Sequence, residues 1–277
     1  MKSKRILISS LIILVLGSGA YFFWDKELIP IEGTIVTVEE EVVDAEKARV
    51  EFNLPNATSH QVVERPFYTF SYNEEAEQPD WIPYTLYPLP DSLRVKRKDN
   101  FRADPLVISG SASLKDYKSS GYDRGHLTPA KALSYSKEAM NASFYLSNMS
   151  PQIGIGFNRG VWKKIEAKIF EWSNKSDSLY VVTGPILDNP LGTIGENKVA
   201  IPRAYYKTIF RFKDGSISGI GFLIDHKKFP NRTKVTDFIA SIDSIEKVSG
   251  IDFYHQMDSV QQAKIEVNKE LAKFIRE

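Results

Sequence analysis

Two short blocks of sequence constrain this chain more than any other feature. The first is Gly121-Tyr-Asp-Arg-Gly-His-Leu-Thr-Pro-Ala130, which places a histidine, a glycine and an oppositely charged pair side by side. The second runs from Leu146-Ser-Asn-Met-Ser-Pro-Gln152 to Phe157-Asn-Arg-Gly-Val-Trp162, and Glu166 follows it. A short motif carries meaning only in a fitting structural context. Together the blocks predict one domain in which the histidine of the first meets polar side chains of the second.

The segments around the blocks predict a sheet. Four runs rich in β-branched and aromatic residues, bounded by Gly, Pro or Asp, are typical of strands. These runs are Trp81–Leu86, Leu179–Thr183, Tyr205–Phe212 and Ile217–Ile224.

Apolar residues at helical spacing predict helices beside this sheet. One helix is marked by the series Trp162, Ile165, Ile169 and Trp172, and two more are expected over Val235–Ile245 and Ser259–Ile275. Strands and helices do not alternate regularly, so an α+β domain is favoured over a doubly wound one.

Both blocks resemble the DNA/RNA non-specific endonuclease family, the ββα-metal (His-Me finger) enzymes that include secreted bacterial nucleases and mitochondrial endonuclease G. The likeness extends from about Phe67 to about Tyr254. It implies a ββα-metal nuclease fold with a central, mainly antiparallel sheet flanked by helices. It also implies hydrolysis of DNA and RNA with one Mg²⁺ ion, or Mn²⁺ as an alternative, and products with 5′-phosphate ends. Family members often dimerise, so a homodimer is a further expectation.

His126 is the residue expected to activate the attacking water. The ordinary pKa of histidine lies near physiological pH, so a neutral imidazole accepts a proton where a carboxylate is too weak a base. A lone histidine is more often a buried structural residue, and the resemblance favours catalysis here. His60, His226 and His255 lie outside any motif and are expected to be structural or surface residues.

Asn158 and Glu166 are the residues expected at the metal ion. The resemblance implies that Asn158 binds the ion directly, and a neutral carboxamide leaves nearly the full cation charge for the phosphate. The residues alone also fit an asparagine in a glycine-rich turn. If one helix carries both residues, their side chains point within about 80° of each other. Glu166 would then reach the ion through a water, while its neighbours Lys163 and Lys164 also suit an exposed helix carboxylate.

The first block and its surroundings supply the remaining candidates. Asn148 matches a family position near the active site, and an orienting hydrogen bond there competes with a turn role before Pro151. Asp123 and Arg124 are expected to build a turn and its ion-pair support, with Arg124 also able to reach phosphate. Gly125 fits a tight backbone bend in that turn.

Arg97 is the candidate for a direct phosphate contact. It lies in Arg97-Lys-Asp-Asn-Phe-Arg102, which resembles a family segment whose arginine contacts the substrate. A guanidinium suits two-point binding of phosphate oxygens. The chain departs from the family pattern at Phe170, where the secreted bacterial nucleases often have an arginine. The protein is therefore expected either to make fewer phosphate contacts or to use Lys168 in place of that arginine.

Charge is unevenly distributed, although the 277-residue chain carries a formal net charge of only +1. Between Arg94 and Lys168 there are 14 Lys and Arg against 6 Asp and Glu, which gives this part +8 and the rest −7. A basic groove holds a phosphate backbone without reading sequence, while lysine-rich faces are more often simply solvated. The chain has no cysteine, which excludes a thiol nucleophile, a disulfide and Cys-ligated zinc.

The N-terminus predicts an exported or membrane-anchored protein. Lys2, Lys4 and Arg5 precede an apolar stretch that ends at Trp24, so residues 1–24 are expected to be a signal peptide or a retained transmembrane helix. Positive residues stay inside, which places the catalytic domain outside the cytoplasm. Residues 25–60 are expected to be an acidic stalk, and residues 61–277 a single endonuclease domain.

Two other function classes stay open from the sequence. One is a nucleic-acid binding module on the same fold without catalysis, which needs the basic groove but not both His126 and Asn158. The other is a phosphodiesterase on a smaller exported substrate, whose few phosphate contacts give a shallow salt dependence. We expect an endonuclease that binds DNA and RNA through the phosphate backbone, and a membrane contact through the N-terminal segment.

Overall fold

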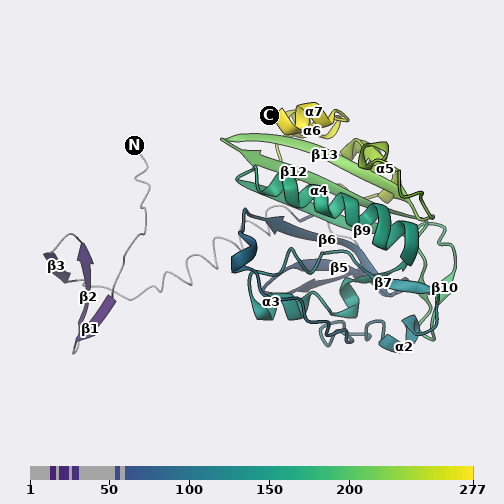
Figure 1. The fold of residues 1–277 in the computed structure, drawn as a ribbon, viewed down its shortest axis with the longest axis horizontal. Coiled ribbons are helices and arrows are strands. Elements are labelled where there is room, and N and C mark those ends of the chain that lie inside the picture. The colour runs from purple at the N-terminus through teal and green to yellow at the C-terminus, as the bar shows by residue number, and fades with distance from the viewer. Residues whose placement is uncertain (1–12, 17–18, 25–26, 31–53, 57–59, 277) are drawn as a thin grey trace. The chain divides into compact units, whose positions relative to one another are not determined.

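The computed structural model describes residues 13–16, 19–24, 27–30, 54–56 and 60–276. Contacts divide the chain into two units, Met1–Glu51 and Phe52–Glu277. The second unit holds the central sheet and its helices (Figure 1). It begins before residue 61, since the backbone N–H of Asn56 donates to the carbonyl of Asp252 at 2.9 Å and the side chain of Gln256 donates to the carbonyl of Leu54 at 3.0 Å.

The first unit differs from the helical anchor expected over residues 1–24, part of which lies outside the described residues. Strands β1 (Ile13–Leu16), β2 (Gly19–Trp24) and β3 (Glu27–Pro30) pair antiparallel in that order. A short apolar run rich in β-branched and aromatic residues fits a strand as well as a helix, and periodicity does not separate the two. In the described parts of the chain, no helix has the length and apolar character needed to cross a membrane. The expected stalk over 25–60 is described only at 27–30, 54–56 and 60.

A seven-stranded sheet forms the centre of the second unit, in the order β14-β13-β12-β9-β6-β5-β4. Every neighbouring pair in it is antiparallel, as predicted for a mainly antiparallel sheet. Its strands are β4 (Gln61–Glu64), β5 (Thr69–Asn73), β6 (Gln78–Leu86), β9 (Ser178–Ile186), β12 (Ala204–Lys213), β13 (Ser216–Asp225) and β14 (Ile239–Ala240). All four predicted strand runs lie within it.

The longest hairpin of the sheet is set by its turn. Lys213 pairs with Ser216, which leaves Asp214-Gly215 as a two-residue loop. Both loop residues have positive φ, 48° and 80°, as the primed hairpin turns require, and Asp-Gly is a favoured sequence for them. This local choice fixes the register of β12 against β13.

Helices cover both faces of the sheet (Figure 1). The predicted apolar series is buried, and it belongs to α4 (Lys163–Ser173) with Trp162 immediately before it. Side chains alternate along each strand, so on β12 Tyr205 and Ile209 pack with α4 while Tyr206 and Phe210 pack with α5 (Ile242–Ser249) and α6 (Ser259–Glu266).

The two C-terminal helices predicted as single segments are each interrupted. Over Val235–Ile245 the chain forms a short turn, η4 (Val235–Phe238), then the edge strand β14, because Ile239 pairs with Phe222 before Ser241 caps α5. Over Ser259–Ile275 the helix stops at Glu266 and restarts as α7 (Leu271–Arg276). Asn268 lies between, and its side chain bonds the carbonyl of Gly219 and the N–H of Glu270, which competes with helical hydrogen bonds.

The two sequence blocks fold into a β-hairpin followed by a helix. Strand β7 (Tyr122–His126) pairs antiparallel with β8 (Met149–Ile153), and an irregular segment, η3 (Gly154–Trp162), leads into α4. Short elements complete the unit: η1 (Asp91–Leu93), α2 (Leu114–Tyr117), α3 (Lys137–Ala142), η2 (Leu146–Asn148), β10 (Thr193–Ile194) and β11 (Val199–Ala200). The chain therefore brings His126, Asn158 and Glu166 onto one ββα motif.

Candidate active site

The first block is a strand, and the turn expected at Asp123 and Arg124 is absent from it. Gly125 pairs with Ser150 in the hairpin rather than making a bend. A Cβ on Gly125 would collide with the buried side chain of Gln152. The glycine is thus needed for close packing across β7 and β8, not for backbone freedom.

His126 ends β7 in an aromatic setting. Its ring lies 5.1 Å from the ring of Phe144 and 5.7 Å from that of Phe101. Its Nε2 is buried and has no hydrogen-bond partner among the described residues. Burial lowers the pKa of His126 to about 3, and the nearby charges of Arg97 and Arg124 act in the same direction. The ring is therefore neutral near pH 7.

Asn158 is oriented by Asp123. The Nδ2 of Asn158 donates to Oδ2 of Asp123 at 3.0 Å, and Arg159 forms an ion pair with the same carboxylate at 3.2 Å. Gly154 leaves room for this arrangement, since a Cβ there would collide with Arg159. With its NH₂ group held by Asp123, Asn158 has its carbonyl oxygen Oδ1 left for another partner. Asp123 therefore does form an ion pair, as expected, and its partner is Arg159.

Glu166 lies in the first turn of α4, but Asn158 does not share that helix. Gly160 interrupts η3 with non-helical angles, φ −119° and ψ −109°, so the predicted 80° relation through one continuous helix does not apply. Glu166 is half-buried, and its Oε1 is buried without a hydrogen-bond partner. Trp162, at the end of η3, connects this helical part of the site to β7, because its Nε1 donates to the carbonyl of His126 at 3.2 Å.

Lys207 is a charged residue beside this site that is not among the predicted site residues. It is fully buried on β12, and its Nζ donates to the carbonyl of Leu127 at 3.3 Å and to Oγ1 of Thr183 at 3.2 Å. The Nζ also lies 4.1 Å from the ring centre of Trp162. Burial raises the pKa of Glu166, and the charge of Lys207 opposes that rise. The sequence did hold one signal that could have identified Lys207: a lysine at a core-facing position of a strand rich in apolar residues.

Asn148 fixes the backbone just after the histidine. Its Oδ1 accepts from the N–H of Thr128 at 2.9 Å, and its Nδ2 donates to the carbonyls of Thr128 at 2.9 Å and Ser143 at 2.8 Å. The residue is fully buried. Because all its amide atoms are used by the backbone, Asn148 contributes orienting hydrogen bonds and not substrate contacts.

Arg97 and Arg124 are exposed and line a hollow of about 520 Å³ that Asn158 also lines. Arg124 lies over the ring of Phe101 at 4.2 Å, and Arg97 lies 5.0 Å from the ring centre of Phe144. Arg97 also pairs with Asp99 at 2.7 Å. The two aromatic rings that hold these arginines are the same two that contact His126, so the arginines stand beside the histidine.

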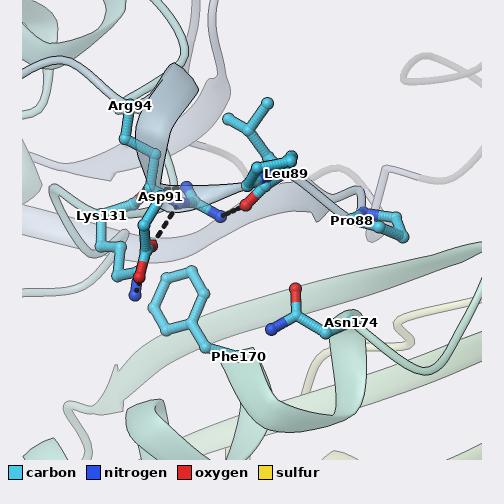
Figure 2. Close-up of a pocket in the computed structure, with 8 residues that line it drawn as sticks. Pro88, Leu89, Asp91, Arg94, Lys131, Phe170 and Asn174 are labelled. Carbon is cyan, nitrogen blue, oxygen red and sulfur yellow. Dashed lines mark hydrogen bonds and ion pairs between the residues drawn. The ribbon is translucent and has the colours of Figure 1, made fainter.

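A second hollow, of about 300 Å³, lies along α4 beyond Glu166. Figure 2 shows Phe170 and Asn174 projecting from the helix toward Arg94 and Lys131, which both pair with Asp91. The Nζ of Lys131 is 5.2 Å from the ring centre of Phe170. Lys168 is instead paired with Glu171 at 2.6 Å. The basic groups near Phe170 are therefore Arg94 and Lys131.

The oxygen donors of Asn158 and Glu166 suit a hard, hydrated cation. Mg²⁺ accepts one or two protein oxygens and keeps most of its waters. Asn158 offers one oriented carboxamide oxygen, and Glu166 offers a buried oxygen without a protein partner. Among the described residues, the group of three acidic side chains close enough to share an ion lies elsewhere, at Asp243, Glu246 and Glu266. Asn158 at the first hollow and Glu166 in α4 together fit a single, mostly hydrated ion.

Comparison with known proteins places this arrangement in a family. The sequence model of the DNA/RNA non-specific endonuclease family matches residues 46–259. Nuclease C1 of Cunninghamella echinulata var. echinulata is 33% identical over 217 residues, which cover 73% of this chain and 85% of that protein. The mitochondrial nuclease of Saccharomyces cerevisiae is 32% identical, with 72% of this chain and 67% of the relative covered. Mitochondrial endonuclease G of Caenorhabditis elegans is also 32% identical, covering 69% and 67%.

A solved structure agrees with the sequence comparison. The crystal structure of the EndoG/EndoGI complex, described as showing the mechanism of EndoG inhibition, contains a chain that superposes with a TM-score of 0.71 at 26% identity. The match covers 81% of this chain and 95% of that one. The chain thus belongs to the DNA/RNA non-specific endonuclease family.

Proposed function

We propose that this protein is a Mg²⁺-dependent endonuclease that hydrolyses phosphodiester bonds in DNA and RNA with little sequence preference, with Mn²⁺ as an alternative ion. His126 acts as general base, Asn158 holds the ion, and Glu166 reaches it through a water. The observation that carries the proposal is the placement of His126, whose Nε2 has no hydrogen-bond partner among the described residues, on one ββα motif with Asn158 and Glu166 and beside Arg97 and Arg124. His226, by contrast, has both ring nitrogens bonded to the backbone.

The base step follows from the chemistry of the ring. A neutral imidazole takes a proton from an attacking water as the oxygen bonds to phosphorus. Trp162 and Asn148 support this step, because they bond the backbone of His126 and Thr128 and so limit movement of the ring. When bound, the ion supplies positive charge to the phosphate and the departing 3′ oxygen. Asp123 directs Asn158 toward it.

The absence of sequence preference follows from the kinds of contact available. Arg97 and Arg124 face the hollow with guanidinium groups, which bind phosphate oxygens. Phosphate contacts carry no base information. Arg94 and Lys131, at the second hollow, extend this basic surface along α4, so a strand longer than one nucleotide is the expected ligand.

The test is a substrate panel with the full-length chain. Supercoiled plasmid, single-stranded RNA and a small aryl phosphodiester are each incubated with Mg²⁺ and with EDTA. We expect Mg²⁺-dependent cutting of both polymers and steep inhibition by salt. Tight, salt-sensitive DNA binding without cutting would favour the binding module, and fast hydrolysis of the small ester alone would favour the small-substrate enzyme.

A further inference from the structure

An acidic cluster on the C-terminal helices is unrelated to the candidate active site. Asp243 and Glu246 lie on α5 and Glu266 ends α6, and one carboxylate oxygen of each lies within 4.8 Å of the others. These helices pack on the sheet face opposite α4, together with Ile242, Ile245 and Ile265. The cluster is thus separated from His126 by the sheet.

The three carboxylates have no basic partner. In the described part of the chain, none of them forms an ion pair with a lysine or arginine. Three like charges at this spacing repel one another unless a cation or protons neutralise them. Two neutral protein donors reach the cluster: the backbone N–H of Phe253 donates to Glu246 at 3.0 Å, and the side chain of Gln262 bonds Glu266.

Glu266 provides an independent sign of a missing partner. The residue is only 4% exposed, and its Oε1 is buried without any hydrogen-bond partner. A buried carboxylate oxygen left without a hydrogen-bond partner destabilises the folded state. The Oε1 belongs to the same side chain that meets Asp243 and Glu246, so the unsatisfied oxygen and the unneutralised charge are at one place.

The donor chemistry selects the class of ion. All three donors are carboxylate oxygens, which suit a hard cation and not zinc, whose usual ligands include nitrogen and sulfur. Calcium binds oxygen at about 2.3–2.6 Å, so two ligands on one ion lie no more than about twice that apart. The three oxygens lie within 4.8 Å of one another, so one ion can contact all of them. Calcium also tolerates irregular geometry and flexible ligands, whereas Mg²⁺ requires a near-ideal octahedron.

We propose that Asp243, Glu246 and Glu266 form a calcium site that joins α5 to α6 and fixes both helices on the sheet. Ile265, next to Glu266, packs against Gly219 of β13, and Ile245, next to Glu246, packs against Gly221 of the same strand. An ion between the two helices therefore stabilises their contact with one strand. Its role is stability of the C-terminal half and not catalysis.

Calorimetric titration of the full-length Asn158→Ala protein with CaCl₂ tests the site, because this background removes the proposed catalytic ligand. We expect about one bound ion, and a rise in Tm of roughly 5–10 °C at about one hundred times the Kd. Glu266→Gln and the more exposed Asp243→Asn should each abolish both responses. Glu270→Gln removes one exposed charge nearby and should leave both unchanged.

Three outcomes would overturn the proposal. One is a folded Asn158→Ala protein with neither heat of binding nor Tm shift on adding CaCl₂. The second is a response that survives in both Glu266→Gln and Asp243→Asn. The third is a Glu266→Gln protein that is more stable than its parent while the parent ignores calcium, since that would mean the carboxylates are neutralised by shared protons.

Discussion

At the scale of single residues, Asp123 does two tasks at once. It accepts a hydrogen bond from Asn158 and pairs with Arg159 through the same oxygen, Oδ2. Among the described residues the side chain of Asn158 has no other hydrogen-bond partner, so Asp123 alone decides which way its carboxamide oxygen points. Groups that orient a metal ligand in this way affect affinity for the ion nearly as strongly as the ligand itself.

Replacing Asp123 with alanine should weaken the response to Mg²⁺. We expect the Mg²⁺ concentration for half-maximal cleavage to rise about 10–100-fold, with a smaller change in the rate at saturating Mg²⁺. Asp225→Ala is the matched control, because Asp225 pairs with Lys227 on an exposed surface. An unchanged Mg²⁺ dependence in Asp123→Ala would show that Asn158 is not oriented by this carboxylate.

His226 is a structural histidine, as the sequence indicated. Its Nε2 accepts from the N–H of Ile153 at 2.9 Å, and its Nδ1 bonds the carbonyl of Pro202 at 2.8 Å. The rings of Phe157 and Tyr205 lie 4.9 Å and 5.1 Å away. Burial lowers the pKa of His226, and the bond to Pro202 opposes this.

Stability should therefore fall as the pH is lowered through the ordinary histidine pKa near 6.5. The unfolded chain takes up the proton first, so the stability from neutral His226 is present above pH 6.5 and is lost as pH falls toward the lowered folded value. His126 acts with the same sign. Between about pH 7.5 and about pH 5.5 the urea midpoint should drop less in His226→Gln than in wild type. The exposed His255→Gln should drop as much as wild type, and equal drops in all three proteins would contradict this account.

At the scale of elements, the sequence predicted the long strands and α4 because their signals are local. Strand-forming residues fill the two segments Tyr205–Phe212 and Ile217–Ile224, and an Asp-Gly turn joins them. No contact with another element is needed to recognise this hairpin in the sequence. The breaks at Ile239 and Asn268 were missed, since each depends on a bond to β13, a strand distant in sequence.

The candidate site, like the fold, was predictable where its signals are local in sequence. The two continuous blocks predicted the candidate residues His126, Asn158 and Glu166. Lys207 was missed because its position beside Trp162 arises only when β12 packs under α4. The role of Gly125 was also missed, because the sequence does not distinguish a glycine needed for a turn from one needed for close packing. The packing role depends on the side chain of Gln152, which only the structure places against Gly125.

Gly125→Ala should destabilise the ββα motif. The added methyl meets the side chain of Gln152, which is fully buried and has no room to move outward. Overpacking of this kind costs about 1–3 kcal/mol, measured as a loss in the free energy of unfolding in urea. Adding Gln152→Ala removes the obstacle and should restore part of the loss. If the double variant were as unstable as the two single losses added together, the clash would not be the cause.

At the scale of the whole molecule, positive charge is concentrated in the central part of the chain. The charge of the central part of the chain, +8 between Arg94 and Lys168, is offset by −7 in the rest. We therefore expect nucleic acid to be attracted to this central part of the chain, and the attraction to weaken as salt rises.

Export through residues 1–24 stays a prediction, based on Lys2, Lys4 and Arg5 before an apolar stretch. Fusing alkaline phosphatase, which folds only outside the cytoplasm, after residue 60 should give an active reporter in a bacterial host. Deleting residues 1–24 from the same fusion should abolish the activity. Equal activity with and without these residues would refute export by this segment.

The measurement that tests the central claim most directly is the initial rate of plasmid nicking in Mg²⁺ by the full-length wild type and His126→Ala. Loss of a general base costs about 10²–10⁴-fold in rate, so we expect a loss in this range at an unchanged urea midpoint at about pH 8. His255→Ala, which removes an exposed histidine outside the site, should cut at the wild-type rate. A folded His126→Ala protein that nicks plasmid as fast as wild type would contradict the assignment of His126 as the base.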